Sequence, residues 1–169
     1  LQDINQAGPE TAGEKNAWRI CLLGFSWTAS SLIEEISRER PDLLAEIAVI
    51  DFNPLVHERL RQRQIHTVYG DITARDVLHH AGVTRAEVII CSLPNTVLKG
   101  SDNLKMLRQL RELNPSARIV VHAELLAAAP KLYEAGASYV TAPRLLEAAD
   151  LLHVIEAAEQ NLLDQKNQA

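Results

Sequence analysis

The chain has 169 residues, a formal net charge of −5 at pH 7, and 47% hydrophobic and 23% charged residues. This length suffices for one well-buried domain, and the composition is that of an ordinary globular protein. The negative charge and the scattered basic residues argue against nucleic acid as a partner, because phosphate binding needs clustered Lys and Arg. No apolar run reaches the ~18–20 residues that a membrane-spanning helix needs.

Short apolar runs alternate with helical patterns after a polar, aperiodic segment at residues 1–16, which we interpret as a flexible leader or linker. The runs are aliphatic or β-branched, as expected of parallel strands covered on both faces. Strands are predicted over 18–23, 46–51, 65–69, 87–91, 117–122 and 138–140. Helices are predicted over 28–40, 54–63, 74–80, 101–113, 125–135 and 144–163.

This alternation predicts an α/β fold, a Rossmann-like, doubly wound, parallel six-stranded sheet with a long C-terminal helix. We assign residues 17–143 to the Rossmann-like domain and 144–169 to a C-terminal amphipathic helix and tail. Nothing follows this helix that it could pack on, so we expect an intersubunit role for it. The apolar face of the helix at 101–113 is a second candidate interface, unless it simply covers the sheet.

A glycine turn joins the first predicted strand to the first helix. It reads Gly24-Phe25-Ser26-Trp27-Thr28-Ala29, where a dinucleotide-binding unit carries G-x-G-x-x-G. Gly24 suits the tight turn, and the helix N-terminus offers N–H groups to a phosphate. Ser26 replaces the glycine that lets a pyrophosphate approach, and its hydroxyl either crowds a ligand or binds its phosphate. The bulky Trp27 either shields a ligand or fills part of its space.

An acidic residue, Asp51, ends the second predicted strand. It stands about 20 residues past the glycine turn, the spacing of a carboxylate that holds a ribose. Such a carboxylate favours NAD or an adenosine nucleotide over a 2′-phosphorylated one. Asn53 is placed to cap the helix that Pro54 opens, which leaves Asp51 freer for a ligand.

Polar residues also follow the later strands. Asp71 either binds an adenine amino group or the backbone, or caps a helix, a role that Thr73 also suits. Ser92 and Asn95 follow the fourth strand, where turn chemistry is the alternative to ligand binding. After the fifth strand come His122 and Glu124, either groups for a second ligand or surface residues.

Catalytic and metal motifs are not apparent in the sequence. The histidines lack metal-ligand spacing, and there is no nucleophile elbow or Walker lysine. Cys21 and Cys91 lie in apolar runs and are interpreted as buried small hydrophobes, with nothing to support a redox role. We therefore predict a protein that is not an enzyme. Its start at Leu1, with Met106 as its one methionine, suggests a piece of a larger protein.

Several segments together resemble the RCK family, regulators of K⁺ conductance that are also called TrkA-N domains. The resemblance covers roughly residues 18–160. Its segments are GFSWTA, VIDFNP, YGDIT, IICSLPNT, DNLKMLRQLRELNPSARIVVHAE and LYEAGASYVTAP, in that order. The wording of SLPNT and DNLKMLRQLR is most similar to C-terminal regulatory domains of bacterial cation/proton antiporters of the Kef and related types.

The resemblance implies a cytosolic, dimeric domain that binds NAD(H), ATP, ADP or AMP and does no chemistry on it. It implies attachment to a membrane-embedded K⁺ or cation transport domain, in the same full-length chain, that is regulated through dimer rearrangement. Carried over by position, the nucleotide site comprises Gly24, Ser26, Trp27, Thr28, Ala29, Asp51, Asn53, Asp71, Thr73 and Ser92. Ser26 makes a mononucleotide such as AMP a contender against a full dinucleotide.

Two other functions stay open on the sequence. One is a fragment of an NAD-dependent dehydrogenase that lacks its substrate domain. The other is a ligand-free assembly domain of Rossmann shape.

Overall fold

A single parallel sheet organises the chain in the computed structural model, which describes residues 18–160. The strand order is β3-β2-β1-β4-β5-β6, so β1 lies at the centre between β2 and β4. The strands are β1 (Ile20–Leu23), β2 (Ile47–Asp51), β3 (His66–Tyr69), β4 (Val88–Cys91), β5 (Arg118–His122) and β6 (Tyr139–Thr141). This confirms the predicted doubly wound sheet, with strand ends within two residues of those expected. The leader assigned to residues 1–16 lies outside the described residues.

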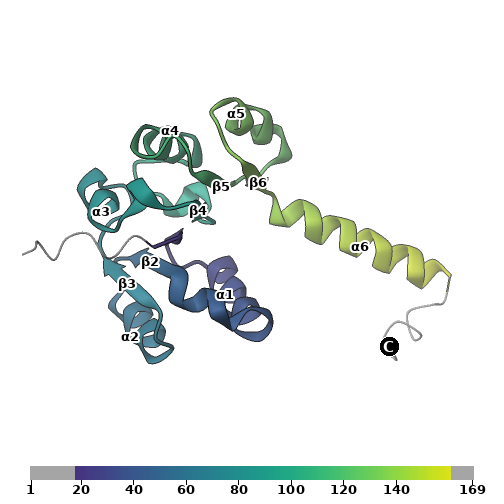
Figure 1. The fold of residues 1–169 in the computed structure, drawn as a ribbon. Helices are drawn as coiled ribbons and strands as arrows, with labels where there is room; N and C mark the ends of the chain where they lie inside the picture. The colour runs from purple at the N-terminus through teal and green to yellow at the C-terminus, as the bar shows by residue number, and fades with distance from the viewer. Residues whose placement is uncertain (1–17, 161–169) are drawn as a thin grey trace, which may run out of the picture.

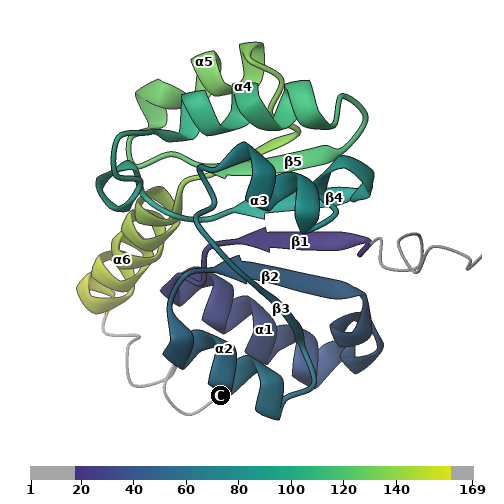
Figure 2. The same cartoon turned by 90° about the vertical axis from the view of Figure 1, so that its left-hand side faces the viewer.

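Helices lie on both sides of the sheet (Figures 1 and 2). They are α1 (Trp27–Glu39), α2 (Pro54–Gln62), α3 (Arg75–His80), α4 (Asn103–Leu113), α5 (Ala129–Glu134) and α6 (Pro143–Glu159). Short 3-10 turns also occur at η1 (Pro41–Glu46), η2 (Val83–Arg85), η3 (Asn95–Val97) and η4 (Leu126–Ala128). The predicted helix at 125–135 is thus η4 followed by the shorter α5.

The two faces of the sheet form two separate apolar clusters, because successive strand residues point to opposite faces. One cluster joins the strands to α3, α4 and α5 and includes Leu78, Leu107 and Leu132. The other joins β1 and β2 to α1 and α2 through Ile33 and Leu60. No described helix covers this second face over β5 and β6, where Tyr139 is 57% exposed and Val120 only half-buried.

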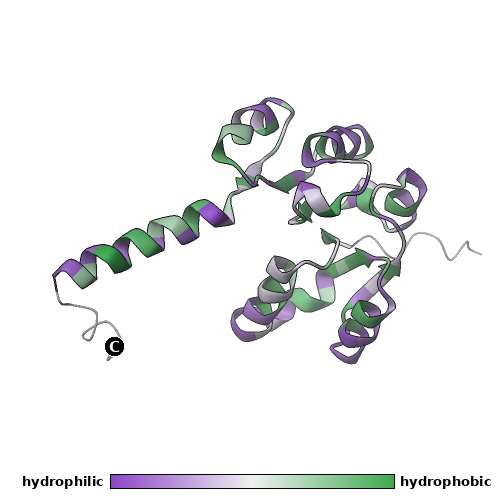
Figure 3. Ribbon diagram, turned by 180° about the vertical axis from the view of Figure 1, so that it is seen from behind, coloured by the Kyte–Doolittle hydropathy of each residue, from purple (hydrophilic) through white to green (hydrophobic). Residues whose placement is uncertain are grey.

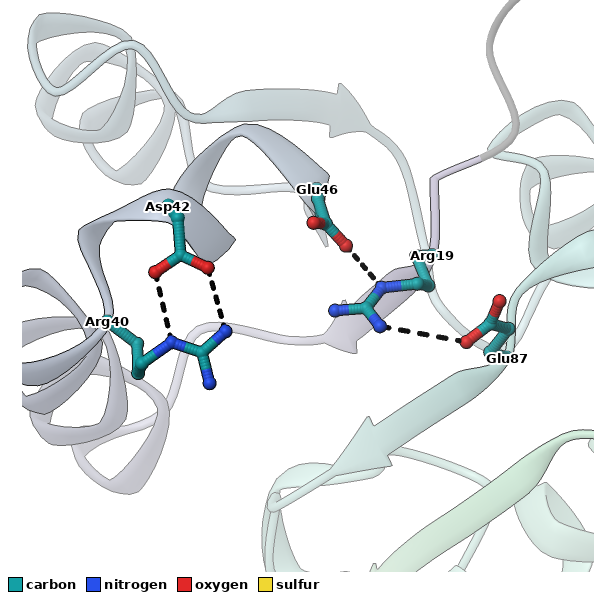
Figure 4. A network of polar contacts seen from close by, with 5 residues as sticks. All are labelled: Arg19, Arg40, Asp42, Glu46 and Glu87. Carbon is teal, nitrogen blue, oxygen red and sulfur yellow. Dashed lines mark hydrogen bonds and ion pairs between the residues drawn. The ribbon is translucent and has the colours of Figure 1, made fainter.

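The amino-terminal edge of the sheet is held by exposed ion pairs (Figure 4). Arg19, just before β1, contacts Glu46 before β2 and lies 3.9 Å from Glu87 before β4. Arg40 binds both carboxylate oxygens of Asp42 at 3.0 and 2.7 Å. Exposed pairs of this kind contribute little to stability.

The last helix corrects one expectation. α6 projects away from the sheet and its covering helices, and apolar residues occur along its whole length (Figures 1 and 3). Leu145 and Val154 lie about two and a half turns apart and so point to opposite sides, as do Leu146 and Ile155. All four are exposed. The helix is therefore not amphipathic: its apolar side chains surround the axis instead of sharing one face.

Candidate functional site

A cavity of about 560 Å³ lies at the carboxyl ends of β1, β2 and β3, within the range of small-ligand sites. In parallel α/β sheets ligands bind at this edge, near the point where the strand order reverses. That reversal falls between β1 and β4. The cavity is lined by Gly24, Asp51, Phe52, Asp71, Ile72, Thr73, Leu93, Thr96, Val97, Leu98 and Lys99. Its walls are mainly apolar, with two carboxylates and one ammonium group among them.

Gly24, the first residue of the glycine turn, lines this cavity. Gly24 has φ +76°, a left-handed conformation that favours glycine, and its N–H donates to the carbonyl of Ile50 on β2. A side chain at this position would also collide with Leu93. The turn therefore needs Gly24 for two reasons, its backbone angle and the close approach of the segment after β4.

The first turn of α1 is organised by Ser26. Its Oγ caps the helix by accepting from the N–H of Ala29 at 3.0 Å, and it also lies 2.6 Å from the Oγ of Ser92. Ala29 is buried, as its expected helix-packing role requires, whereas Trp27 is 93% exposed and fills none of the cavity. The N–H groups of Trp27 and Thr28 precede any intrahelical acceptor and are available to an anion.

The carboxylate of Asp51 bridges two backbone segments. One oxygen accepts from the N–H of Phe25 at 2.8 Å, and the other accepts from the N–H of Asn53 at 2.7 Å. Asn53 caps α2, as predicted, by accepting from the N–H of Leu55. Asp51 is nevertheless less free than expected, because it also holds the glycine turn against the end of β2. Each carboxylate oxygen keeps further acceptor capacity, and Asp51 lines the cavity.

Asp71 and Thr73 form a compact turn after β3. Asp71 accepts from both the N–H and the hydroxyl of Thr73 at 2.8 Å. The alternative that either residue caps the next helix is wrong, since Ala74 stands at the cap position of α3 without a side-chain bond. Asp71 remains exposed at the cavity wall, opposite the segment that follows β4.

The segment after β4 closes the site from the other side and was largely missed from the sequence. Its carbonyl at Leu93 accepts from the Nδ2 of Asn103 at 2.9 Å, and the same amide donates to Asn95 at 2.8 Å. Asn103 is 1% exposed, so these bonds fix the segment firmly. Asn95 thus stabilises the turn after β4, which is the predicted alternative to ligand binding. No sequence motif signals that Leu93 packs on the glycine turn.

The predicted site residues divide into two groups. Four line the cavity: Gly24, Asp51, Asp71 and Thr73. Six lie beside it without lining it: Ser26, Trp27, Thr28, Ala29, Asn53 and Ser92. The cavity-lining residues that the sequence did not single out are mostly apolar: Phe52, Ile72, Leu93, Thr96, Val97, Leu98 and Lys99.

A separate cavity of about 300 Å³ lies at the end of β5 and contains His122 and Glu124. The Nδ1 atom of His122 is buried and has no hydrogen-bond partner among the described residues. Burial lowers the pKa of His122, Arg144 lowers it further, and Glu124 opposes the shift. His122 and Glu124, the predicted candidates for a second ligand, therefore line the same cavity of about 300 Å³, which is separate from the cavity at Asp51.

Thiol and metal chemistry find little support in residues 18–160. β1 and β4 are neighbours, but burial raises the pKa of Cys21 to about 12 and that of Cys91 to about 11. Both thiols are protonated near neutral pH and inert. Within these residues no group of three or more His, Cys, Asp or Glu is arranged to hold a metal ion, and no helix is long and apolar enough to cross a membrane.

The chain is similar to several known proteins. KefC of Escherichia coli, a glutathione-regulated potassium-efflux system protein, is 32% identical over 78 residues, 46% of this chain and 12% of KefC. The chain spans 21% or less of the curated relatives first matched. The TrkA-N domain of the Escherichia coli inner membrane protein YbaL superposes with a TM-score of 0.69 at 22% identity, over 82% of this chain and 97% of that one.

The GsuK channel has also been solved with NAD and with ADP. Both structures give a TM-score of 0.61, at 23% and 24% identity, over 76% and 75% of this chain and 22% and 31% of theirs. These likenesses show the fold. The family assignment comes from the sequence, in which residues 20–143 match the TrkA-N domain. Together with the parallel sheet and its cavity at the strand ends, that match shows that the chain belongs to the TrkA-N domain family.

Proposed function

We propose that this chain is a nucleotide-sensing regulatory domain of a protein that transports K⁺ or another monovalent cation. The observation that carries the proposal is the cavity at the ends of β1, β2 and β3, where Asp51 and Asp71 lie among apolar walls. Two relatives support the biological context, since KefC is a potassium-efflux protein and GsuK is a channel solved with NAD and with ADP.

The polar and apolar groups that line the cavity suit an adenosine nucleotide. Asp51 accepts hydrogen bonds from ribose hydroxyls, and the apolar side chains of Ile72 and Leu98 offer a surface on which a base packs. The same carboxylate disfavours an added 2′-phosphate through like charge. The N–H groups of Trp27 and Thr28 at the start of α1 suit a phosphate. The ligand is thus NAD(H) or AMP, ADP or ATP.

We further propose that the domain performs no reaction on its ligand. The two carboxylates of the site already accept hydrogen bonds from backbone N–H groups, which fix them as part of the local backbone structure. Such groups suit the binding of a ligand rather than a reaction on it. Regulation then follows from linkage, in which a nucleotide that binds one arrangement better shifts the population toward it.

The arrangement that shifts is proposed to be a homodimer or higher oligomer on the cytoplasmic side of the membrane. α6 leaves apolar side chains exposed on every side, and the sheet face over β5 and β6 is uncovered by described helices. A helix apolar all round is stable only when buried. A second copy covers such surfaces, and movement of α6 transmits the change to a membrane-embedded transport domain.

Calorimetric titration of AMP, ADP, ATP, NAD⁺ and NADH into the refolded, ligand-stripped protein tests the proposal. We expect micromolar binding of at least one of them. Asp51→Asn should weaken it about tenfold or more, because a hydrogen bond to a charged group is worth ~1.5–3 kcal/mol. Asp76→Asn is the matched control, since Asp76 is exposed on α3 and does not line the cavity.

Two results would contradict the proposal. Failure of the wild-type chain to bind any of the five nucleotides would favour a ligand-free assembly domain. Equal affinity of wild type and a folded Asp51→Asn variant would show that the ribose does not bind at Asp51.

A further inference from the structure

We infer that the hydroxyl pair Ser26–Ser92 is a specificity determinant that confines the site to adenosine mononucleotides and excludes dinucleotides. The inference rests on the proposed nucleotide-binding function and concerns the same cavity. It starts from the one position where the glycine turn departs from G-x-G-x-x-G, the serine in place of the second glycine.

The pair lies at the place that a dinucleotide must cross. In a doubly wound sheet the two halves of a dinucleotide lie on either side of the strand-order reversal, with the pyrophosphate at the glycine turn. Here the reversal separates β1 from β4, and Ser26 follows β1 while Ser92 follows β4. Their Oγ atoms lie 2.6 Å apart, so a hydrogen bond spans the crevice from one wall to the other.

This hydrogen bond is held in place by its surroundings. The Oγ of Ser26 also accepts from the N–H of Ala29, which fixes its side-chain orientation at the start of α1. Ser92 is only 7% exposed. Separating the two hydroxyls would leave Ser92 buried with one fewer partner, and an unpaired buried polar group is costly. The crevice therefore resists opening by a ligand.

Leu93 blocks the same route on the cavity side. Its side chain lies so close above Gly24 that even a methyl group on the glycine would collide with it. Asn103 holds the Leu93 carbonyl at 2.9 Å, and Ser92 precedes it, so Leu93 is fixed on both sides. A pyrophosphate needs close access to the glycine turn, which the second glycine normally provides.

The cavities on the two sides of the crevice are consequently separate. The larger one contains Asp51 and Asp71 and is wide enough for a nucleoside and its phosphate. The smaller one contains His122 and shares none of the lining residues of the first. A mononucleotide fits on the Asp51 side, whereas the second nucleotide of NAD has no open path across.

Titrations of AMP and NAD⁺ into the wild-type chain and a Ser26→Gly/Ser92→Ala double variant test the inference. Wild type should bind AMP at least about tenfold more tightly than NAD⁺, a difference of ~1.4 kcal/mol. In the double variant the preference for AMP over NAD⁺ should fall about tenfold, mainly because NAD⁺ binds more tightly. Glycine at position 26 costs the helix cap only a few tenths of a kcal/mol, so the variant should stay folded.

Two controls separate the hydroxyl pair from other effects. Ser92→Ala alone removes the bridge but keeps the Ser26 cap, and it should shift the preference in the same direction. Ser37→Ala removes another hydroxyl of α1, one that bonds only the carbonyl of Ile33, and it should leave both affinities unchanged.

The possible failures are distinguishable. Equal affinity of wild type for AMP and NAD⁺ overturns the specificity role but leaves the nucleotide sensor intact. An unchanged preference in the folded double variant does the same. Absence of binding to every adenosine ligand, in wild type and variant alike, overturns the proposed function and this inference with it.

Discussion

The helices α4 and α6 are both rich in leucine but differ in how deeply their apolar side chains are buried. Met106, Leu107 and Leu110 of α4 are completely buried. In α6, by contrast, Leu146 is 71% exposed and Ile155 is 56% exposed. The buried residues of α4 lie on one face, which packs on the sheet, whereas α6 projects away from the sheet and its apolar residues share no face.

The ends of the two helices differ in the same way. α4 is capped at its start by Asp102, which accepts from the N–H of Lys105, and at its end by the buried Asn114. α6 has no side-chain hydrogen bond at its N-cap residue, Ala142. α4 is thus packed within this domain, whereas α6 leaves apolar side chains exposed, which we propose a second copy covers. The buried apolar face of α4 covers the sheet, as one of its two predicted roles requires.

The largest expected change in stability comes from truncating a side chain on the buried face of α4. Leu110→Ala removes a completely buried side chain from the cluster under α4. We expect the free energy of unfolding to fall by ~2–5 kcal/mol, through lost apolar contacts and the cavity left behind. Urea denaturation followed by circular dichroism measures it. A loss below ~1 kcal/mol would mean that α4 is less tightly packed than described.

A smaller effect is expected at the end of α4. The Nδ2 of Asn114 donates to the carbonyls of Val83 and Ala86 at 2.9 and 2.8 Å. Asn114→Ala leaves both acceptors buried without this donor, so unfolding should become easier by ~1–3 kcal/mol. Gln62→Ala is the matched control, because the amide of Gln62 contacts only the exposed Glu58. Equal stabilities of the two variants would refute the structural role of Asn114.

The smallest effect on folding is expected in α6. Leu152 is 54% exposed, so Leu152→Ala should change the unfolding free energy of the isolated chain by no more than ~0.5 kcal/mol. Its effect should appear instead in sedimentation equilibrium, as weaker self-association than that of wild type. A stability loss comparable to that of Leu110→Ala, in a chain that stays monomeric, would show that α6 packs against its own domain.

The fold was predictable from the sequence because buried parallel strands leave continuous apolar runs. Residues 46–51, EIAVID, show this pattern, and β2 (Ile47–Asp51) is buried except for its final Asp51. Asn53 followed by Pro54 likewise identified the start of α2. The amphipathic prediction for α6 is wrong because Leu151 and Val154 lie outside the stripe that Leu145 and Leu152 share.

The site was predictable only in part, for a different reason. Gly24 and Asp51 occupy positions that strand ends bring together in any fold of this order. The contact between Ser26 and Ser92 joins residues 66 positions apart, and no local pattern encodes it. It depends on how Asn103 folds the segment after β4 against the glycine turn. Asp71 was assigned a second role as a cap because turn and cap chemistry use the same side chains.

The central place of β1 has a consequence for how the molecule is made. Of the six strands of this sheet β1 is synthesised first, yet Ile20 pairs on one side with Ile47 and on the other with Val88. Parallel strands cannot pair through a tight turn, so each pairing waits for a complete crossover. The nascent chain therefore carries an apolar strand with an open edge until β4 has been synthesised. Distant pairings of this kind slow folding, and they expose such a strand to chaperones and to aggregation.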